Sequence, residues 1–141
     1  MKSGLSNFEI ESLFKDEIGF QGCFMRNEPL PKYGSFILNL DDLKGEGTHW
    51  VAVHADKKLY YDSYGIAPPM ELEGIKFKDY NLVQHQKLNS GLCALYCMYF
   101  IYRLNRGIDF YTINYIELKH NGKKNNYVRL KNLLSEMQKE D

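Results

Sequence analysis

The segment that decides the fold is residues 90–105, which read SGLCALYCMYFIYRLN. From Leu92 onward nearly every position is apolar or aromatic, which is typical of a helix that is buried on all sides. Ser90 or Asn89 is the expected N-cap, and Gly107 follows at a position where helices commonly end. The apolar run is shorter than the about 20 residues that a bilayer-spanning helix needs. We therefore expect a central helix in the core of the protein.

The segments around this helix predict strands and further helices. Ser6 with Glu9 three positions later forms a capping box, which predicts a helix over residues 6–14. Two β-rich runs joined by a short polar link predict a hairpin over residues 49–61. The other expected elements are a loop at 20–32, a strand at 35–40, a turn at 41–47, a strand at 80–84, a helix or turn at 109–118 and an amphipathic helix at 126–138. This order predicts an α+β fold in a single domain over residues 1–141.

The composition excludes several classes of protein. The 141 residues contain 18 Lys and Arg against 18 Asp and Glu, so the formal net charge is zero and a function that rests on bulk positive charge is disfavoured. Hydrophobic residues make up 44% of the chain and aromatic residues 14%, enough for a packed core. The three cysteines are too few and odd in number for a disulfide scaffold, and they offer neither a CxxC pair nor the four thiolates of a structural zinc site. We expect free thiols in a reducing compartment, and no signal peptide is visible.

Cys93 is the candidate nucleophile, because it lies in the first turn of the expected central helix. Unpaired N–H groups and the positive end of the helix dipole favour a thiolate there. Cys97 lies one turn deeper and is expected to be an inert core thiol, and Cys23 has no obvious activating neighbour. Taken alone, however, Cys93 fits a small buried hydrophobe better.

A nucleophilic thiol needs a base, and the base needs an acceptor that orients it. His49 begins one strand of the hairpin and Asp62 ends the other, so the two side chains are expected side by side. His54 lies near the hairpin loop and is expected to be a solvated strand residue. His85 is close to the cysteine in sequence but has no evident acceptor. On spacing alone, a structural hydrogen bond between His49 and Asp62 is the preferred interpretation.

Acyl transfer also needs donors for a developing oxyanion. The backbone N–H of Cys93 is one candidate, and a side-chain amide just before the helix is the other. Gln84 and Gln86 are both available for this role. An ordinary surface glutamine is the commoner case for either residue.

Three motifs occur in order along the chain: GTHWVAV at 47–53, YYDSYG at 60–65, and Gln86 followed by NSGLC at 89–93. Together they resemble the adenovirus-protease-like cysteine peptidases, the clan that also holds the ubiquitin-like-protein (SUMO) proteases. Over residues 1–105 the chain looks most like the maturation proteases of Polinton/Maverick elements, adintoviruses, virophages and giant viruses.

The resemblance implies a papain-like core, with a mixed sheet packed by helices and the nucleophile at the start of the central helix. It implies Cys93 as the nucleophile, His49 as the general base and Asp62 as its orienting acid. Gln86 and the Cys93 N–H would then form the oxyanion hole. The separation of seven residues between Gln86 and Cys93 matches the adenovirus enzyme and favours Gln86 over Gln84.

The resemblance also implies a narrow cleft that admits small residues, typically glycine, next to the scissile bond. The implied substrate-binding positions are Trp50, Gly47, Asn89, Ser90 and Gly91. Trp50 also suits the core of the hairpin. The chain departs from the family pattern at Ala94, where glycine is usual, and in having Asp62 where the adenovirus enzyme has glutamate.

The function implied by the resemblance is cleavage of viral capsid or core precursors at Gly-containing sites. The alternatives are a deubiquitinase or SUMO protease acting on host modifiers, and a non-catalytic peptide-binding module. We expect a monomer with a protein substrate, no membrane partner, no metal, and a location in the virion, the host cytoplasm or a viral factory. No counterpart of the adenovirus cysteine that pairs with an activating peptide is present, so a peptide or DNA cofactor is not carried over. A basic cluster, for which a solvated helix face is preferred over nucleic-acid binding, comprises Lys119, His120, Lys123, Lys124, Arg129 and Lys131.

Overall fold

The computed structural model describes residues 4–40, 49–87, 90–120 and 123–139. Its centre is a five-stranded mixed sheet in which the strands lie in sequence order. The outer pairs are parallel and the two central pairs are antiparallel. The strands are β1 (Phe20–Met25), β2 (Ser35–Asn39), β3 (Trp50–His54), β4 (Leu59–Tyr61) and β5 (Asp79–Tyr80).

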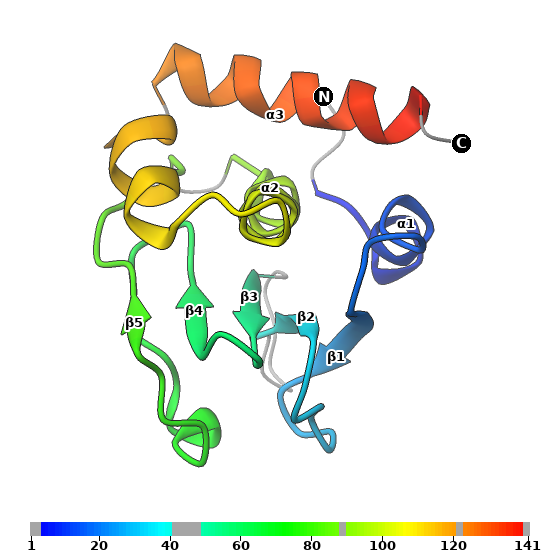
Figure 1. Cartoon of the computed structure of the whole chain (residues 1–141), viewed down its shortest axis with the longest axis vertical. Coiled ribbons are helices and arrows are strands. Elements are labelled where there is room, and N and C mark those ends of the chain that lie inside the picture. The colour runs from blue at the N-terminus through cyan, green and yellow to red at the C-terminus, as the bar shows by residue number, and fades with distance from the viewer. Residues whose placement is uncertain (1–3, 41–48, 88–89, 121–122, 140–141) are drawn as a thin grey trace.

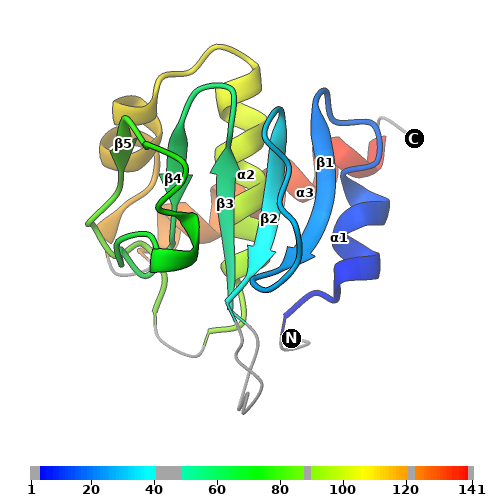
Figure 2. The ribbon, with the colours of Figure 1, turned by 90° about the horizontal axis from the view of Figure 1, so that it is seen from below.

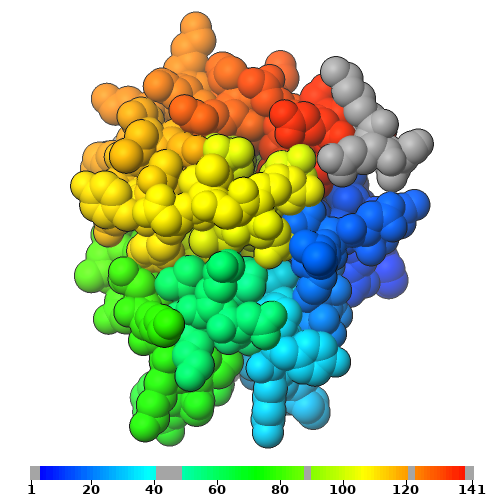
Figure 3. Space-filling model, in the orientation of Figure 1, coloured from blue at the N-terminus to red at the C-terminus, as the bar shows by residue number. Residues whose placement is uncertain are grey.

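The helices lie mainly on one face of this sheet (Figure 1). Helix α2 (Cys93–Asn105) packs across the central strands, and α3 (Lys124–Lys139) lies on its outer side. Helix α1 (Asn7–Leu13) lies next to β1 at one edge, and a π-helix, η2 (Thr112–Glu117), lies near the opposite edge (Figure 2). Figure 3 shows α3, in orange and red, covering one end of the molecule.

Apolar burial explains this arrangement. Ten of the 13 residues of α2 are buried, and they form one core with the sheet, α1 and α3. A second apolar cluster covers the other face of the sheet, where a 3-10 turn, η1 (Met70–Leu72), contributes Leu72. None of the helices in the described ranges has both the length and the apolar character needed to cross a membrane.

The expected α+β fold is confirmed, and so are several of its elements. The hairpin of β3 and β4, the strand β2, the central helix and the terminal helix all form where the sequence predicts them. Ser6 and Glu9 make both hydrogen bonds of the capping box. The expected turn at 41–47 lies outside the described residues.

Three local predictions are wrong. The expected loop at 20–32 contains β1, because its prolines come after the strand and its backbone pairs in parallel with β2. The expected strand at 80–84 is only the two residues of β5. Helix α2 begins at Cys93 after Leu92, without a side-chain cap, and the hydroxyl of Ser90 accepts a hydrogen bond from Gln86 instead.

Gly65, which follows β4, adopts a left-handed conformation with φ of 75°. A Cβ atom there would lie 2.9 Å from the carbonyl carbon of Val83 and 3.0 Å from the nitrogen of Gln84. We expect Gly65→Ala to lower the free energy of unfolding by about 3 kcal/mol, from backbone strain plus this clash. Gly107→Ala tests the backbone strain by itself, because Gly107 has a φ of 87° but no atom lies close to the position of a Cβ. We expect it to lower the free energy of unfolding by about 1 kcal/mol.

Gly74→Ala is the matched control for these two variants, because Gly74 has neither a left-handed φ nor a close neighbour. Urea unfolding should show a change of about 0.5 kcal/mol or less for this variant. Equal losses for Gly65→Ala and Gly107→Ala would contradict a role for the contact between Gly65 and the segment that leads to Gln86.

Candidate active site

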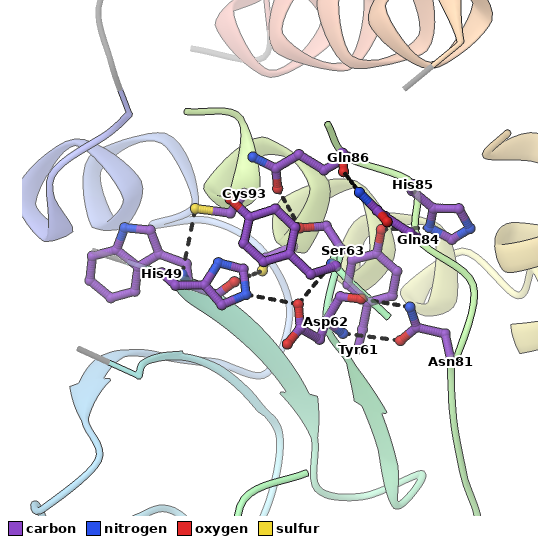
Figure 4. A network of polar contacts seen from close by, with 12 residues as sticks. His49, Tyr61, Asp62, Ser63, Asn81, Gln84, His85, Gln86 and Cys93 are labelled. Atoms are coloured by element: carbon purple, nitrogen blue, oxygen red, sulfur yellow. Dashed lines mark hydrogen bonds and ion pairs between the residues drawn. The ribbon is translucent and has the colours of Figure 1, made fainter. Parts of the chain in front are cut away.

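The β3–β4 hairpin brings His49 and Asp62 together. Its register pairs Ala52 with Tyr61, and continuing that register places His49 opposite Tyr64, two residues beyond Asp62. The Nε2 atom of His49 lies 2.7 Å from Oδ1 of Asp62. The Asp62 side chain is 1% exposed and that of His49 is 21% exposed, so the pair sits at the edge of the core (Figure 4).

Asp62 is held rigidly by its neighbours. Its Oδ1 also accepts a hydrogen bond from the backbone N–H of Tyr64, at 2.8 Å. The side-chain amide of Asn81, itself fully buried, pairs with the backbone N–H and C=O of Asp62 at 3.0 and 2.6 Å. The carboxylate therefore has a fixed direction toward the His49 ring.

The surroundings of His49 favour its protonated form. Burial lowers the pKa of the imidazole. The hydrogen bond with Asp62 and the proximity of Cys93 have the opposite and larger effect, and together they raise the pKa to about 9. The ring stacks on Tyr64 with centroids 4.3 Å apart. Its Nδ1 atom is buried and makes no hydrogen bond to a described residue. In Figure 4 the ring lies between Asp62 and Cys93.

Cys93 is the first residue of α2 and is 5% exposed. The backbone N–H of Trp50 donates to its Sγ atom at 3.5 Å, which ties the start of the helix to the start of β3. Because no side chain caps α2, the N–H groups of its first turn are not used by a capping residue. A developing negative charge beside Cys93 would therefore meet backbone donors and the positive end of the helix dipole.

Gln86 lies beside this helix start and is 1% exposed. Its Oε1 accepts a hydrogen bond from the hydroxyl of Ser63 at 2.5 Å, and its Nε2 donates to the hydroxyl of Ser90 at 2.8 Å. The amide of Gln84 donates to the backbone carbonyl of Gln86 at 2.9 Å, so Gln84 supports the segment. Of the two candidate glutamines, Gln86 has the side-chain amide bound between the two serines near Cys93.

The substrate-binding positions predicted from the sequence do not all line one cavity. Trp50 is buried, its Nε1 donates to the carbonyl of Leu5 at 3.3 Å, and it lines a cavity of about 330 Å³. Gly91 has a φ of 75° and lines a separate apolar cavity of about 280 Å³ between α2 and α3. Gly47 and Asn89 lie outside the described residues.

Two other histidines are structural. The expectation that His54 is solvated is wrong: it is buried, and its Nε2 bonds to Oδ1 of Asn105 at 3.0 Å. His85 does have an acceptor, because its Nε2 lies 2.7 Å from the backbone carbonyl of Asn114. The Tyr61 hydroxyl lies 2.9 Å from its other ring nitrogen, and burial lowers the pKa of His85 to about 4. His85 is therefore neutral and fixed.

Sequence reasoning missed three residues that support the site. Ser63 and Tyr64 directly follow Asp62 in the YYDSYG motif, and they contact Gln86 and His49 respectively. The motif was a signal for both residues, because strand ends that carry one functional side chain often carry others. Asn81 had no signal, since its role depends on the loop that brings it to Asp62.

The described part of the chain holds no group of three or more residues arranged to bind a metal. The three cysteines are free thiols. Four residues of the basic cluster are exposed along α3 and the segment before it: His120, Lys123, Lys124 and Lys131. The site brings together a thiol, an imidazole, a carboxylate and an amide.

A mixed sheet packed on a central helix that begins with a cysteine is the architecture of the papain-like cysteine proteases. A solved structure with this fold is the selenomethionine crystal structure of the ASFV pS273R protease, which matches with a TM-score of 0.60. The match has 17% sequence identity and covers 92% of this chain and 68% of that chain. No protein-family model matches the sequence, and no curated protein sequence matches it. The comparison establishes the fold.

Proposed function

We propose that the protein is a cysteine endopeptidase with Cys93 as its nucleophile. The observation that carries the proposal is the hydrogen-bonded pair of His49 and Asp62 beside a cysteine at the uncapped start of α2. His49 is partly exposed to solvent, has a raised pKa and is paired with a buried carboxylate. This combination is typical of a side chain that transfers protons in catalysis. The similarity in fold to the ASFV pS273R protease supports this assignment.

The mechanism that we propose uses these contacts in turn. With His49 protonated, the Cys93 thiolate attacks the scissile carbonyl carbon and its electron pair moves to the carbonyl oxygen. The Cys93 backbone N–H and the amide of Gln86 stabilise that oxyanion. His49 then gives its proton to the leaving amine, which departs and leaves a thioester. Neutral His49 then takes a proton from water, and the resulting hydroxide attacks the thioester, which releases the carboxylic acid product and restores the Cys93 thiolate beside protonated His49.

The substrate that we propose is a capsid or core precursor cleaved at Gly-containing sites during virion maturation. Cys93 is nearly enclosed, with Trp50 bound to both its sulfur and the Leu5 carbonyl. A nucleophile enclosed in this way favours substrates with small residues next to the scissile bond. With such a substrate, the protein would act in the virion, the host cytoplasm or a viral factory.

The test is to incubate the protein with capsid and core precursors and to map the new N-termini by mass spectrometry. We expect new termini at Gly-containing sites with the wild-type protein and none with Cys93→Ala. If the precursors stay intact while ubiquitin or SUMO vinyl sulfone labels Cys93, the enzyme acts on modifiers. If neither reaction occurs, the proposal is wrong and the non-catalytic peptide-binding module is the alternative that remains to be tested.

A further inference from the structure

Ser63 holds Gln86 at two points. Its hydroxyl donates to Oε1 of the Gln86 side chain at 2.5 Å, and its backbone carbonyl accepts from the Gln86 N–H at 3.1 Å. The same carbonyl accepts from the N–H of His85 at 2.8 Å. Ser63 is fully buried, so water does not compete for these bonds.

These contacts fix which end of the Gln86 amide is presented to the reaction. The Ser63 hydroxyl donates, so it binds the oxygen end and directs Nε2 to the opposite side. One Nε2 proton goes to the hydroxyl of Ser90, three residues before Cys93. The second proton has no partner among the described residues, and it is the one that the proposal assigns to the oxyanion. Without the Ser63 hydroxyl, the buried Oε1 would have no donor in the described part of the chain.

The same turn also holds the opposite half of the site. Asp62, directly before Ser63, accepts from His49, and Tyr64, directly after it, stacks on the His49 ring. Three consecutive residues thus contact both the proposed base and the proposed oxyanion donor. Asp62 and Ser63 are seen between His49 and Gln86 in Figure 4. A shift of this turn would move both groups together.

We propose that Ser63 is a positioning residue that orients the Gln86 amide for oxyanion stabilisation. The proposal rests on the proposed peptidase function and adds a residue to it. Ser63 acts through Gln86 and touches no reacting atom. Its removal should therefore slow acyl transfer, which builds an oxyanion, and leave reactions of Cys93 that build none unchanged.

The test compares two reactions of the same thiol in Ser63→Ala. Acylation is followed with the p-nitrophenyl ester of N-acetylglycine, whose carbonyl oxygen becomes an oxyanion. Alkylation is followed with iodoacetamide, a substitution at a saturated carbon that forms no oxyanion. We expect acylation kcat to fall about tenfold, less than the roughly 100- to 1,000-fold loss on removing a whole oxyanion donor. KM and the alkylation rate should stay within about twofold of wild type.

Two controls make the result specific. Ser35 in β2 is equally buried, but its hydroxyl has no hydrogen-bond partner in the described residues, so Ser35→Ala should leave both reactions unchanged. In a Gln86→Ala background, Ser63→Ala should cause no further loss, because the group that it positions is gone.

The proposal is overturned if Ser63→Ala acylates at the wild-type rate, or if its alkylation rate falls as much as its acylation rate. It is also overturned if Ser63→Ala lowers the acylation rate in the Gln86→Ala background as much as it does in the wild-type protein. If the wild-type protein alkylates but forms no acyl-enzyme, the peptidase proposal fails and this one fails with it. If the wild-type protein forms the acyl-enzyme and Ser63→Ala forms it at the same rate, only the positioning role of Ser63 is overturned.

Discussion

Cys93→Ala should abolish peptide hydrolysis, a loss on the order of 10⁶-fold, because no other group in the site can form the thioester. The other two thiols are poor nucleophiles. Cys97 is fully buried, its thiol donates to the Trp50 carbonyl at 3.3 Å, and burial raises its pKa well above the usual value. Burial and the charge of Glu11 raise the pKa of Cys23 to about 12.

Hydrolysis of a Gly-containing peptide and alkylation by iodoacetamide near pH 7 measure this difference. Cys97→Ala is the matched control, since it removes the next thiol along the same helix and should keep the activity. Mass spectrometry should place the first alkylated site at Cys93 in the wild-type protein. Full activity in Cys93→Ala together with loss in Cys97→Ala would contradict the assignment of the nucleophile.

The parts of the fold that the sequence predicts are those stabilised locally. The hairpin depends on a short polar link between β-rich runs, and the start of α1 depends on the capping box of Ser6 and Glu9. Helix α2 is visible because almost every residue is apolar. In each case the information lies within about a dozen neighbouring positions.

The parts that the sequence does not predict depend on distant partners. Strand β1 has an irregular pattern of partly buried residues and forms because β2, some 15 positions later, offers a parallel edge. β5 is exposed and only two residues long, and it pairs with β4 across a long connection. His54 becomes buried because Asn105, at the end of α2, provides its acceptor.

The candidate site shows the same division. His49 and Asp62 are neighbours because a hairpin register puts them together, and that register can be estimated from the sequence. The contact of Asn81 with the Asp62 backbone crosses 19 positions and has no local pattern. The supporting hydrogen bonds of a site are therefore harder to predict than its reactive groups, although they determine its geometry.

Asp62→Asn should lower kcat/KM by about two to three orders of magnitude, within the range for loss of general acid–base catalysis. The carboxylate does two things that an amide cannot: it accepts from Nε2 of His49 as an anion, and it holds the ring protonated. The amide oxygen of the variant can still accept from the N–H of Tyr64, and the contacts of Asn81 are with the backbone at position 62, so the variant should fold.

The variant should also change the pH profile in a defined direction. In the wild-type protein the hydrogen bond and charge of Asp62 help raise the pKa of His49 from its usual 6.5 to about 9. The imidazolium that protonates the leaving amine therefore persists at neutral pH and is lost as the pH approaches 9. Removing the carboxylate lowers the pKa of His49, so the imidazolium is lost at lower pH. The alkaline limb of kcat/KM must then move toward neutral pH.

The measurement is kcat/KM from pH 5 to 10 for the wild-type protein, Asp62→Asn and Asp56→Asn. Asp56 lies exposed in the hairpin loop, so the same substitution there should leave both the rate and the profile unchanged. An alkaline limb in Asp62→Asn at the wild-type position would contradict the role of Asp62 in holding the His49 proton. A shifted limb with an unchanged maximum would mean that Asp62 sets the charge of His49 without orienting it, which the 2.7 Å contact and the buried carboxylate argue against.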